Sequence, residues 1–231
     1  MKNTSWKRVI RRSLPATAFL AVIGIYSAGP AWAGQLSYEV TIDTSAINGT
    51  SGYLDLQFNP GTLPGTQLAT AVVEGFTSDG TLAIGPLSGV TGDVTGTLPG
   101  AVSFDNQTVF NDDFEGITFG NSIQFELVLS GPAVLTPDGV STSGSTFGVG
   151  LWDSTGSIPL LTSDPNGFVG TVDINLDGSG TTTNFLTDAG GPAVVTFTPE
   201  TPTVTPEPDS ILLFGTGLAA IIGFVRRRFR A

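Results

Sequence analysis

The stretch LSYEVTI, residues 36–42, alternates apolar and polar side chains along its whole length. The apolar members point to one side of an extended chain and the polar members to the other, a period of two that is typical of a half-buried β-strand. The apolar members are Leu36, Tyr38, Val40 and Ile42. The sequence therefore predicts that the fold begins with a strand that has one buried face.

The same alternation recurs along the chain. It appears at residues 54–58, 123–129, 147–151 and 172–176, with weaker candidates at 71–76, 90–98 and 193–197. Turn residues separate these runs, and no window between Gly34 and Pro192 keeps an apolar stripe at helical spacing. We therefore predict an all-β fold, a single β-sandwich or jelly-roll-like domain of about eight to twelve strands over residues 34–197. A solenoid is the weaker alternative, because the repeated Gly-Thr pairs show no constant period.

The charges are separated along the sequence. The chain has 231 residues and a net charge of −11, and all 9 Lys and Arg residues lie before residue 13 or after residue 225. Between Gly34 and Thr205 there are 18 Asp and Glu residues and no Lys, Arg or His. Nucleic-acid binding depends on Lys and Arg that neutralise phosphates, so the sequence argues against a nucleic-acid partner. The carboxylates must be solvated, hydrogen-bonded or neutralised by external cations.

The composition also restricts catalysis. The chain has no Cys, and the predicted domain has no His, so Ser-His-Asp and Cys-His mechanisms and zinc sites are not expected. Two carboxylates could formally serve a glycosidase. Sugar subsites usually contain several indole rings, however, and Trp152 is alone in the domain. We predict that the protein is not an enzyme.

Residues 1–33 have the order of a secretory signal peptide. A basic stretch precedes a short apolar run, and Ala31 and Ala33 supply the small residues of a signal-peptidase cleavage site. The apolar run of residues 14–26 is short for a membrane span, which needs roughly 20 residues. We predict a signal helix that is removed after Ala33, with signal peptidase as a partner during export.

Three features follow one another at the other end of the chain. They are the motif Pro206-Glu207-Pro208, the apolar run 211–225, and the arginines Arg226, Arg227 and Arg228. We predict a Pro/Thr-rich linker at 198–209, a transmembrane helix at 210–225 and a basic tail at 226–231. Arginines favour the cytoplasmic side of a membrane, so the tail is expected to stay cytoplasmic while the domain lies outside.

This order resembles the PEP-CTERM sorting domain of exported proteins in Gram-negative bacteria, whose sorting enzyme is an exosortase. The resemblance implies export through the inner membrane, transient anchoring at the C-terminus, and a location in the cell envelope, on the outer surface or in the extracellular matrix. Some ice-binding proteins carry a similar tail, which is an association through targeting alone. Residues 50–61, 114–131 and 161–168 also resemble a family of PEP-CTERM proteins of unestablished biochemical role, which supports a β fold and supplies no catalytic residues.

Two acidic groups are candidate cation sites. Asp173, Asn175 and Asp177 place oxygen atoms at alternate positions before Gly178, as in the first half of a calcium loop. A plain strand that enters an Asp-Gly turn explains the same residues and is the preferred interpretation, with calcium as the alternative cofactor. The second group, Asp112, Asp113 and Glu115, is interpreted as a solvated loop in preference to a ligand set.

The sequence leads to one main functional hypothesis and two alternatives. The main hypothesis is a non-enzymatic cell-surface or extracellular-matrix protein with a structural or adhesive role. The first alternative is a lectin-like module for extracellular polysaccharide, in which Trp152 or Tyr53 would be exposed beside acidic residues. The more remote alternative is an ice-binding protein, in which a flat and regular threonine array would be expected.

Overall fold

The alternating runs of the sequence become the central strands of two antiparallel sheets. A computed structural model describes residues 35–200. Sheet A consists, in order, of β13 (Val195–Glu200), β1 (Leu36–Asp43), β9 (Ser122–Ser130), β3 (Thr70–Ser78), β7 (Val102–Asp105) and β6 (Val94–Gly96). Sheet B consists of β12 (Gly180–Asn184), β11 (Phe168–Ile174), β10 (Ser145–Asp153), β2 (Ser51–Pro60) and β8 (Asp112–Thr118), followed by the short strands β4 (Thr81–Leu82) and β5 (Gly89–Thr91), which both pair with β8.

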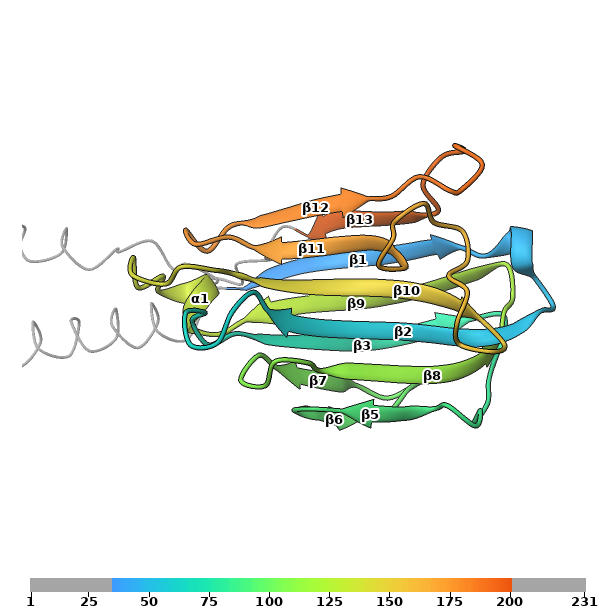
Figure 1. The fold of residues 1–231 in the computed structure, drawn as a ribbon, viewed down its shortest axis with the longest axis horizontal. Helices are drawn as coiled ribbons and strands as arrows, with labels where there is room; N and C mark the ends of the chain where they lie inside the picture. The colour runs from blue at the N-terminus through green and yellow to red at the C-terminus, as the bar shows by residue number, and fades with distance from the viewer. Residues whose placement is uncertain (1–34, 201–231) are drawn as a thin grey trace, which may run out of the picture. The chain divides into compact units, whose positions relative to one another are not determined.

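The two sheets form a β-sandwich, and their strands run along the same long direction in Figure 1. Two short helical segments, η2 (Ser45–Ile47) and α1 (Pro132–Leu135), lie in the connections. The prediction of a β-sandwich is therefore confirmed. None of the helices within residues 35–200 is long and apolar enough to span a membrane. The predicted signal helix, cleavage site and transmembrane helix lie outside the described residues.

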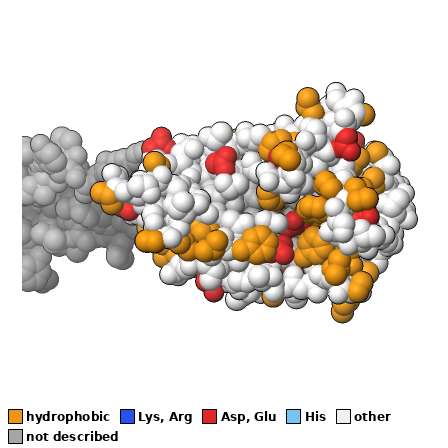
Figure 2. Space-filling model, in the orientation of Figure 1, with side chains coloured by type: hydrophobic (Ala, Val, Ile, Leu, Met, Phe, Trp, Pro, Cys, Tyr) orange, Lys and Arg blue, Asp and Glu red, His pale blue; other side chains and the backbone are white. Residues whose placement is uncertain are grey.

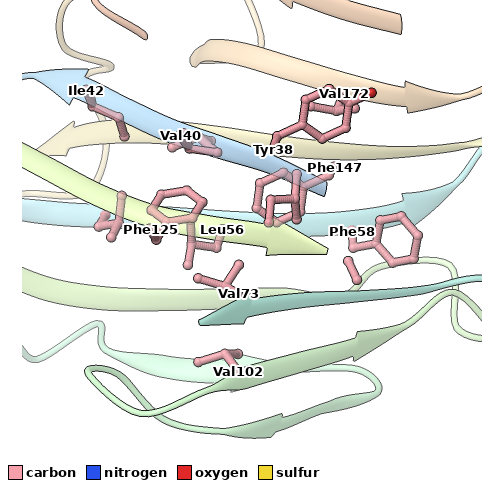
Figure 3. Close-up of a cluster of buried hydrophobic side chains, with 14 of the residues drawn as sticks. Tyr38, Val40, Ile42, Leu56, Phe58, Val73, Val102, Phe125, Phe147 and Val172 are labelled. Carbon is pink, nitrogen blue, oxygen red and sulfur yellow. The ribbon is translucent and has the colours of Figure 1, made fainter. Parts of the chain in front are cut away.

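The apolar members of the alternating runs meet between the sheets (Figure 3). Phe147 of β10 is fully buried and contacts two rings of sheet A edge to face, with centroid distances of 6.3 Å to Phe104 and 6.5 Å to Phe125. Leu56 of β2 and Val40 of β1 are also fully buried. Such burial contributes about 1.5–3 kcal/mol for each large apolar side chain. The core therefore holds the two sheets together.

The strands depart from the predicted boundaries in three places. The run 90–98 contributes to both sheets, as β5 and β6, because the chain turns at Gly92, which has a φ of +79°. Leu176 was expected to continue a strand but is exposed, because β11 ends at Ile174 and a turn at residues 175–178 follows. At the C-terminal end, β13 continues to Glu200, past the boundary predicted at residue 197.

Candidate functional site

The outer face of sheet B carries a group of polar side chains that is partly covered by aromatic rings. Along β2, Leu54, Leu56 and Phe58 point into the core, so the intervening Tyr53, Asp55, Gln57 and Asn59 point outward. The view in Figure 2 shows hydrophobic and acidic side chains gathered close together on one face of the domain. We call the outward-pointing residues of β2, β8, β10 and β11 the outer face.

Glycines on β10 make room for the rings. Gly148 and Gly150 pair with Gln57 and Asp55, and therefore lie on the same face of the sheet. A Cβ atom at Gly148 would lie 2.5 Å from the ring of Phe168, and one at Gly150 would lie 2.8 Å from Nε1 of Trp152. The two rings therefore pack directly against the backbone of β10, which larger residues at the glycine positions would prevent.

Asp55 is the centre of the outer face. It is only 2% exposed, although it lies on the outward side of its strand. Its Oδ2 atom accepts hydrogen bonds from Nε1 of Trp152 at 3.0 Å and from Nε2 of Gln57 at 2.9 Å. Its Oδ1 atom has no hydrogen-bond partner in the described residues. The indole therefore both covers this carboxylate and hydrogen-bonds to it.

A chain of amides continues this hydrogen bonding along β2. The backbone N–H of Asn111 donates to Oδ1 of Asn59, and Nδ2 of Asn59 donates to Oε1 of Gln57. Gln57 in turn donates to Asp55. Burial raises the pKa of Asp55, and the donors of this chain, which all point toward its carboxylate, offset part of that effect.

Asp112 and Asp113 lie on opposite faces of β8. Asp112 pairs with Gln57 and is half-buried on the outer face, within hydrogen-bonding reach of Asp55. Burial first, and then the contact with Asp55, raise the pKa of Asp112 to about 8. Asp113 pairs with Leu56 on the core side and is 1% exposed, and its burial raises its pKa to about 7. The prediction of a solvated loop is wrong here, because β2, β4 and β5 flank β8 and remove these carboxyl groups from water.

The residues of the predicted calcium loop are engaged in local hydrogen bonds. Oδ1 of Asp173, in β11, accepts a hydrogen bond from Oγ1 of Thr146 at 2.5 Å. Oδ1 of Asp177 accepts from the hydroxyl and the backbone N–H of Ser179, which lowers the pKa of Asp177. Within residues 35–200, no three His, Cys, Asp or Glu side chains converge as metal ligands. Calcium binding by Asp173, Asn175 and Asp177 stays a prediction.

A row of glutamates crosses the outer side of sheet A. Glu126 of β9 pairs with Glu39 of β1 and with Glu74 of β3, so three like charges lie side by side on adjacent strands. Burial raises the pKa of Glu126, and the charges of Glu200 and Glu74 raise it further. Like charges directly opposite one another destabilise a sheet. This row is therefore a place where screening by salt stabilises the domain.

The predicted sorting residues lie outside the described part of the chain, and the comparison with family models addresses them. The PEP-CTERM protein-sorting motif matches residues 204–228. The chain carries a PEP-CTERM sorting motif. The match includes Pro206, Glu207 and Pro208 together with Arg226, Arg227 and Arg228. PEP-CTERM motifs in general indicate export, sorting through a C-terminal membrane anchor and processing by exosortase. No curated protein and no solved structure gives a significant match to the chain.

The PEP-CTERM motif concerns the sorting of this protein, whereas the outer face is a feature of its β domain. Sequence reasoning singled out Trp152 and the acidic residues of β8, which it interpreted as a solvated loop, but it did not single out Asp55. One signal was present in the sequence. The glycines at 148 and 150 leave the outward side of β10 without side chains just before Trp152, so an indole can fold back over the neighbouring strand.

Proposed function

We propose that this protein is a non-enzymatic component of the cell surface or extracellular matrix, exported and sorted through its PEP-CTERM motif, with a structural or adhesive β-sandwich. The proposal is supported by the presence, in one chain, of a sorting motif at residues 204–228 and an acidic two-sheet domain. Partners during export are signal peptidase and exosortase. The C-terminal apolar segment is the membrane anchor before processing.

The outer face supports a non-enzymatic role. A catalytic carboxyl group has to reach its substrate, whereas Asp55 is covered by Trp152 and both N–H donors at its Oδ2 atom hold it in place. The hollow next to Tyr53 has a volume of ≈ 180 Å³, and this residue is itself 3% exposed. The Asp55–Asp112 pair therefore resembles a structural element more than a catalytic centre.

Deletion of residues 211–231 tests the sorting part of the proposal. We expect translocation to continue, because the N-terminal segment directs export, and we expect the domain to appear in the soluble fraction in place of the membrane fraction. Fractionation of cells followed by immunoblotting measures the distribution. Retention of the truncated protein in membranes would contradict the anchoring role.

A matched variant separates anchoring from sorting. Glu207→Ala changes the Pro-Glu-Pro motif and leaves the apolar run 211–225 intact. This variant should remain in the membrane fraction at full length, because its anchor is present but its processing signal is altered. If Glu207→Ala is processed like the parent chain, exosortase does not read this motif in the protein.

A second candidate function is binding of extracellular polysaccharide on the outer face. It is favoured by the half-buried rings of Trp152, Phe168 and Phe114 on the same face as the amides of Gln57 and Asn59. Sugars stack on such rings and hydrogen-bond to such amides. The domain has no Lys, Arg or His to pair with uronate or sulfate groups, so a neutral polysaccharide fits better than an anionic one.

The strand β12 places Thr181 and Thr183 on one face and Thr182 on the other, so the ice-binding alternative gains no support there.

Phe168→Ala tests the polysaccharide hypothesis. We expect about tenfold weaker retention on insoluble neutral glucan, because a stacked ring typically contributes more than about 1 kcal/mol to binding. Leu135→Ala is the control, since Leu135 lies in α1, is 52% exposed and is not part of the outer face. Alginate serves as the anionic comparison. Equal retention of the two variants, or stronger binding to alginate than to glucan, would contradict this candidate.

A further inference from the structure

Unpartnered oxygen atoms gather at the junction of β2 and β8. Among residues 35–200, the buried side-chain atoms without a hydrogen-bond partner are Oδ1 of Asp55, Oδ1 of Asp112 and both carboxyl oxygens of Asp113. The Asp55 and Asp112 carboxyl groups lie within hydrogen-bonding reach of each other. A buried acceptor without a partner is costly, and two facing acceptors are both satisfied by one hydrogen atom between them.

The hydrogen-bond donors decide which residue holds that hydrogen. Oδ2 of Asp55 accepts two N–H donors, from Trp152 and Gln57, and these donors favour the ionised form. The carboxyl group of Asp112 accepts no N–H or O–H donor from the described residues. Burial raises the pKa of both groups, but only Asp55 has N–H donors that offset part of this effect, so negative charge is better placed on Asp55 and the proton on Asp112.

No counterion competes with the proton in the described part of the chain. The charged groups at neighbouring positions are all acidic: Asp113 and Glu115 lie on the opposite, core-side face of β8, and Asp93 follows β5, where its backbone N–H donates to Oδ1 of Asn111. β10 contributes Trp152, which does not titrate, and residues 35–200 contain no Lys, Arg or His. A calcium ion takes six to eight oxygen ligands, whereas no third acidic side chain converges on this pair.

We propose that Asp55 and Asp112 share one proton at neutral pH, which Asp112 donates to Oδ1 of Asp55, and that its release to solvent in alkali loosens the pairing of β2 with β8. Two carboxylates in contact repel each other. Asp112 is half-buried and can turn toward water, whereas Asp55 is fixed by its two donors. The site therefore makes the stability of sheet B depend on pH.

The sign of this dependence follows from proton linkage. The pKa of Asp112 is raised from 3.8 in the unfolded chain to about 8 in the folded one, so the native state binds more protons than the unfolded state between these values. Stability falls as pH rises through that window, and one such proton changes the unfolding equilibrium constant up to about tenfold per pH unit. Asp113, with a pKa raised to about 7, adds to the fall in the lower part of the window.

Asp112→Asn isolates the contribution of the shared proton, because its side-chain amide can donate to Oδ1 of Asp55 without titrating. Urea unfolding of the full chain in detergent would be measured from pH 5.5 to 9. Below about pH 8, each pH unit should raise the unfolding equilibrium constant of the parent up to about tenfold more than that of Asp112→Asn. Above about pH 8, the two constants should change equally with pH. Asp188→Asn makes the same substitution at an exposed position and should follow the parent. Parallel pH profiles for the parent and Asp112→Asn would overturn the proposal.

Two further measurements keep the test decisive. If Asp112→Asn does not fold, the fluorescence of Trp152 in the folded parent, taken as the difference from Trp152→Phe, should titrate with a midpoint near pH 8, and a featureless profile would overturn the proposal. Millimolar calcium should not change the pH profile of the parent. If calcium flattens the dependence of the parent's unfolding on pH and leaves that of Asp112→Asn unchanged, a metal ion occupies the pair in place of the proton, and the proposal is wrong.

Discussion

Phe147→Ala should lower the free energy of unfolding by about 3–5 kcal/mol, which is a large share of the stability of a domain this size. Phe147 is fully buried and is the ring of sheet B that contacts both Phe104 and Phe125 of sheet A. Removing it leaves a cavity between the sheets and deletes both edge-to-face contacts. Urea unfolding of the full chain at pH 5.5, followed by circular dichroism, measures the loss.

Phe110→Ala is the control for this prediction. It makes the same chemical change at a ring that is 46% exposed, where surface substitutions usually alter stability by within about 0.5 kcal/mol. Similar losses for the two variants would show that the Phe147 side chain does not lie between two packed sheets.

Gly52→Ala should destabilise the domain by about 3 kcal/mol, because the added methyl group meets backbone that cannot move away freely. Its Cβ atom would lie 2.1 Å from the carbonyl oxygen of Trp152 and 2.7 Å from the ring of Phe119. Gly52 pairs with Asp153 of β10 on one side and with Ile117 of β8 on the other. Relief of the clash must therefore disturb the pairing of β2 with both neighbours at this end of the strands, and thermal unfolding would report it as a lower Tm.

Gly89→Ala provides the matched comparison. A Cβ atom at Gly89, in β5, has no atom within 4 Å, and its backbone is outside the left-handed region. This variant should unfold within about 0.5 kcal/mol of the parent. If Gly52→Ala is equally harmless, the close approach of β2 and β10 at this position does not exist.

The architecture could be predicted because alternation survives wherever one face of a strand is buried. The run 123–129 and the run 147–151 were both expected to be strands, and their apolar members are buried in β9 and β10. Alternation fails as a guide at Leu176, where the turn that follows β11 leaves an apolar side chain in water. It also fails at 90–98, where one apolar run is divided between two sheets.

The central carboxylate of the outer face could not be predicted from local pattern. Asp55 has the position of an outward, solvated residue, and it is buried only because β2 pairs with β10 in a register that brings Trp152, 97 positions away, over it. The same holds for Asp112. In the sequence it belongs to a polar segment, and it is buried because β8 lies between β2 and the short strands β4 and β5. Burial of charge in this domain depends on long-range register.

The pairing of the first strand with the last determines which part of the domain points away from a tether. Ser37 of β1 lies opposite Glu200 of β13, so both ends of the described chain leave from one pole of the sandwich (Figure 1). The connections at 44–50, 119–121 and 154–167 form the opposite pole, about 26 Å away for a strand of eight residues such as β1. If the domain is attached through residue 201 and beyond, these three loops lie at the pole farthest from the attachment. An epitope tag inserted in the loop at 44–50 would therefore lie at the pole opposite to both ends of the described chain.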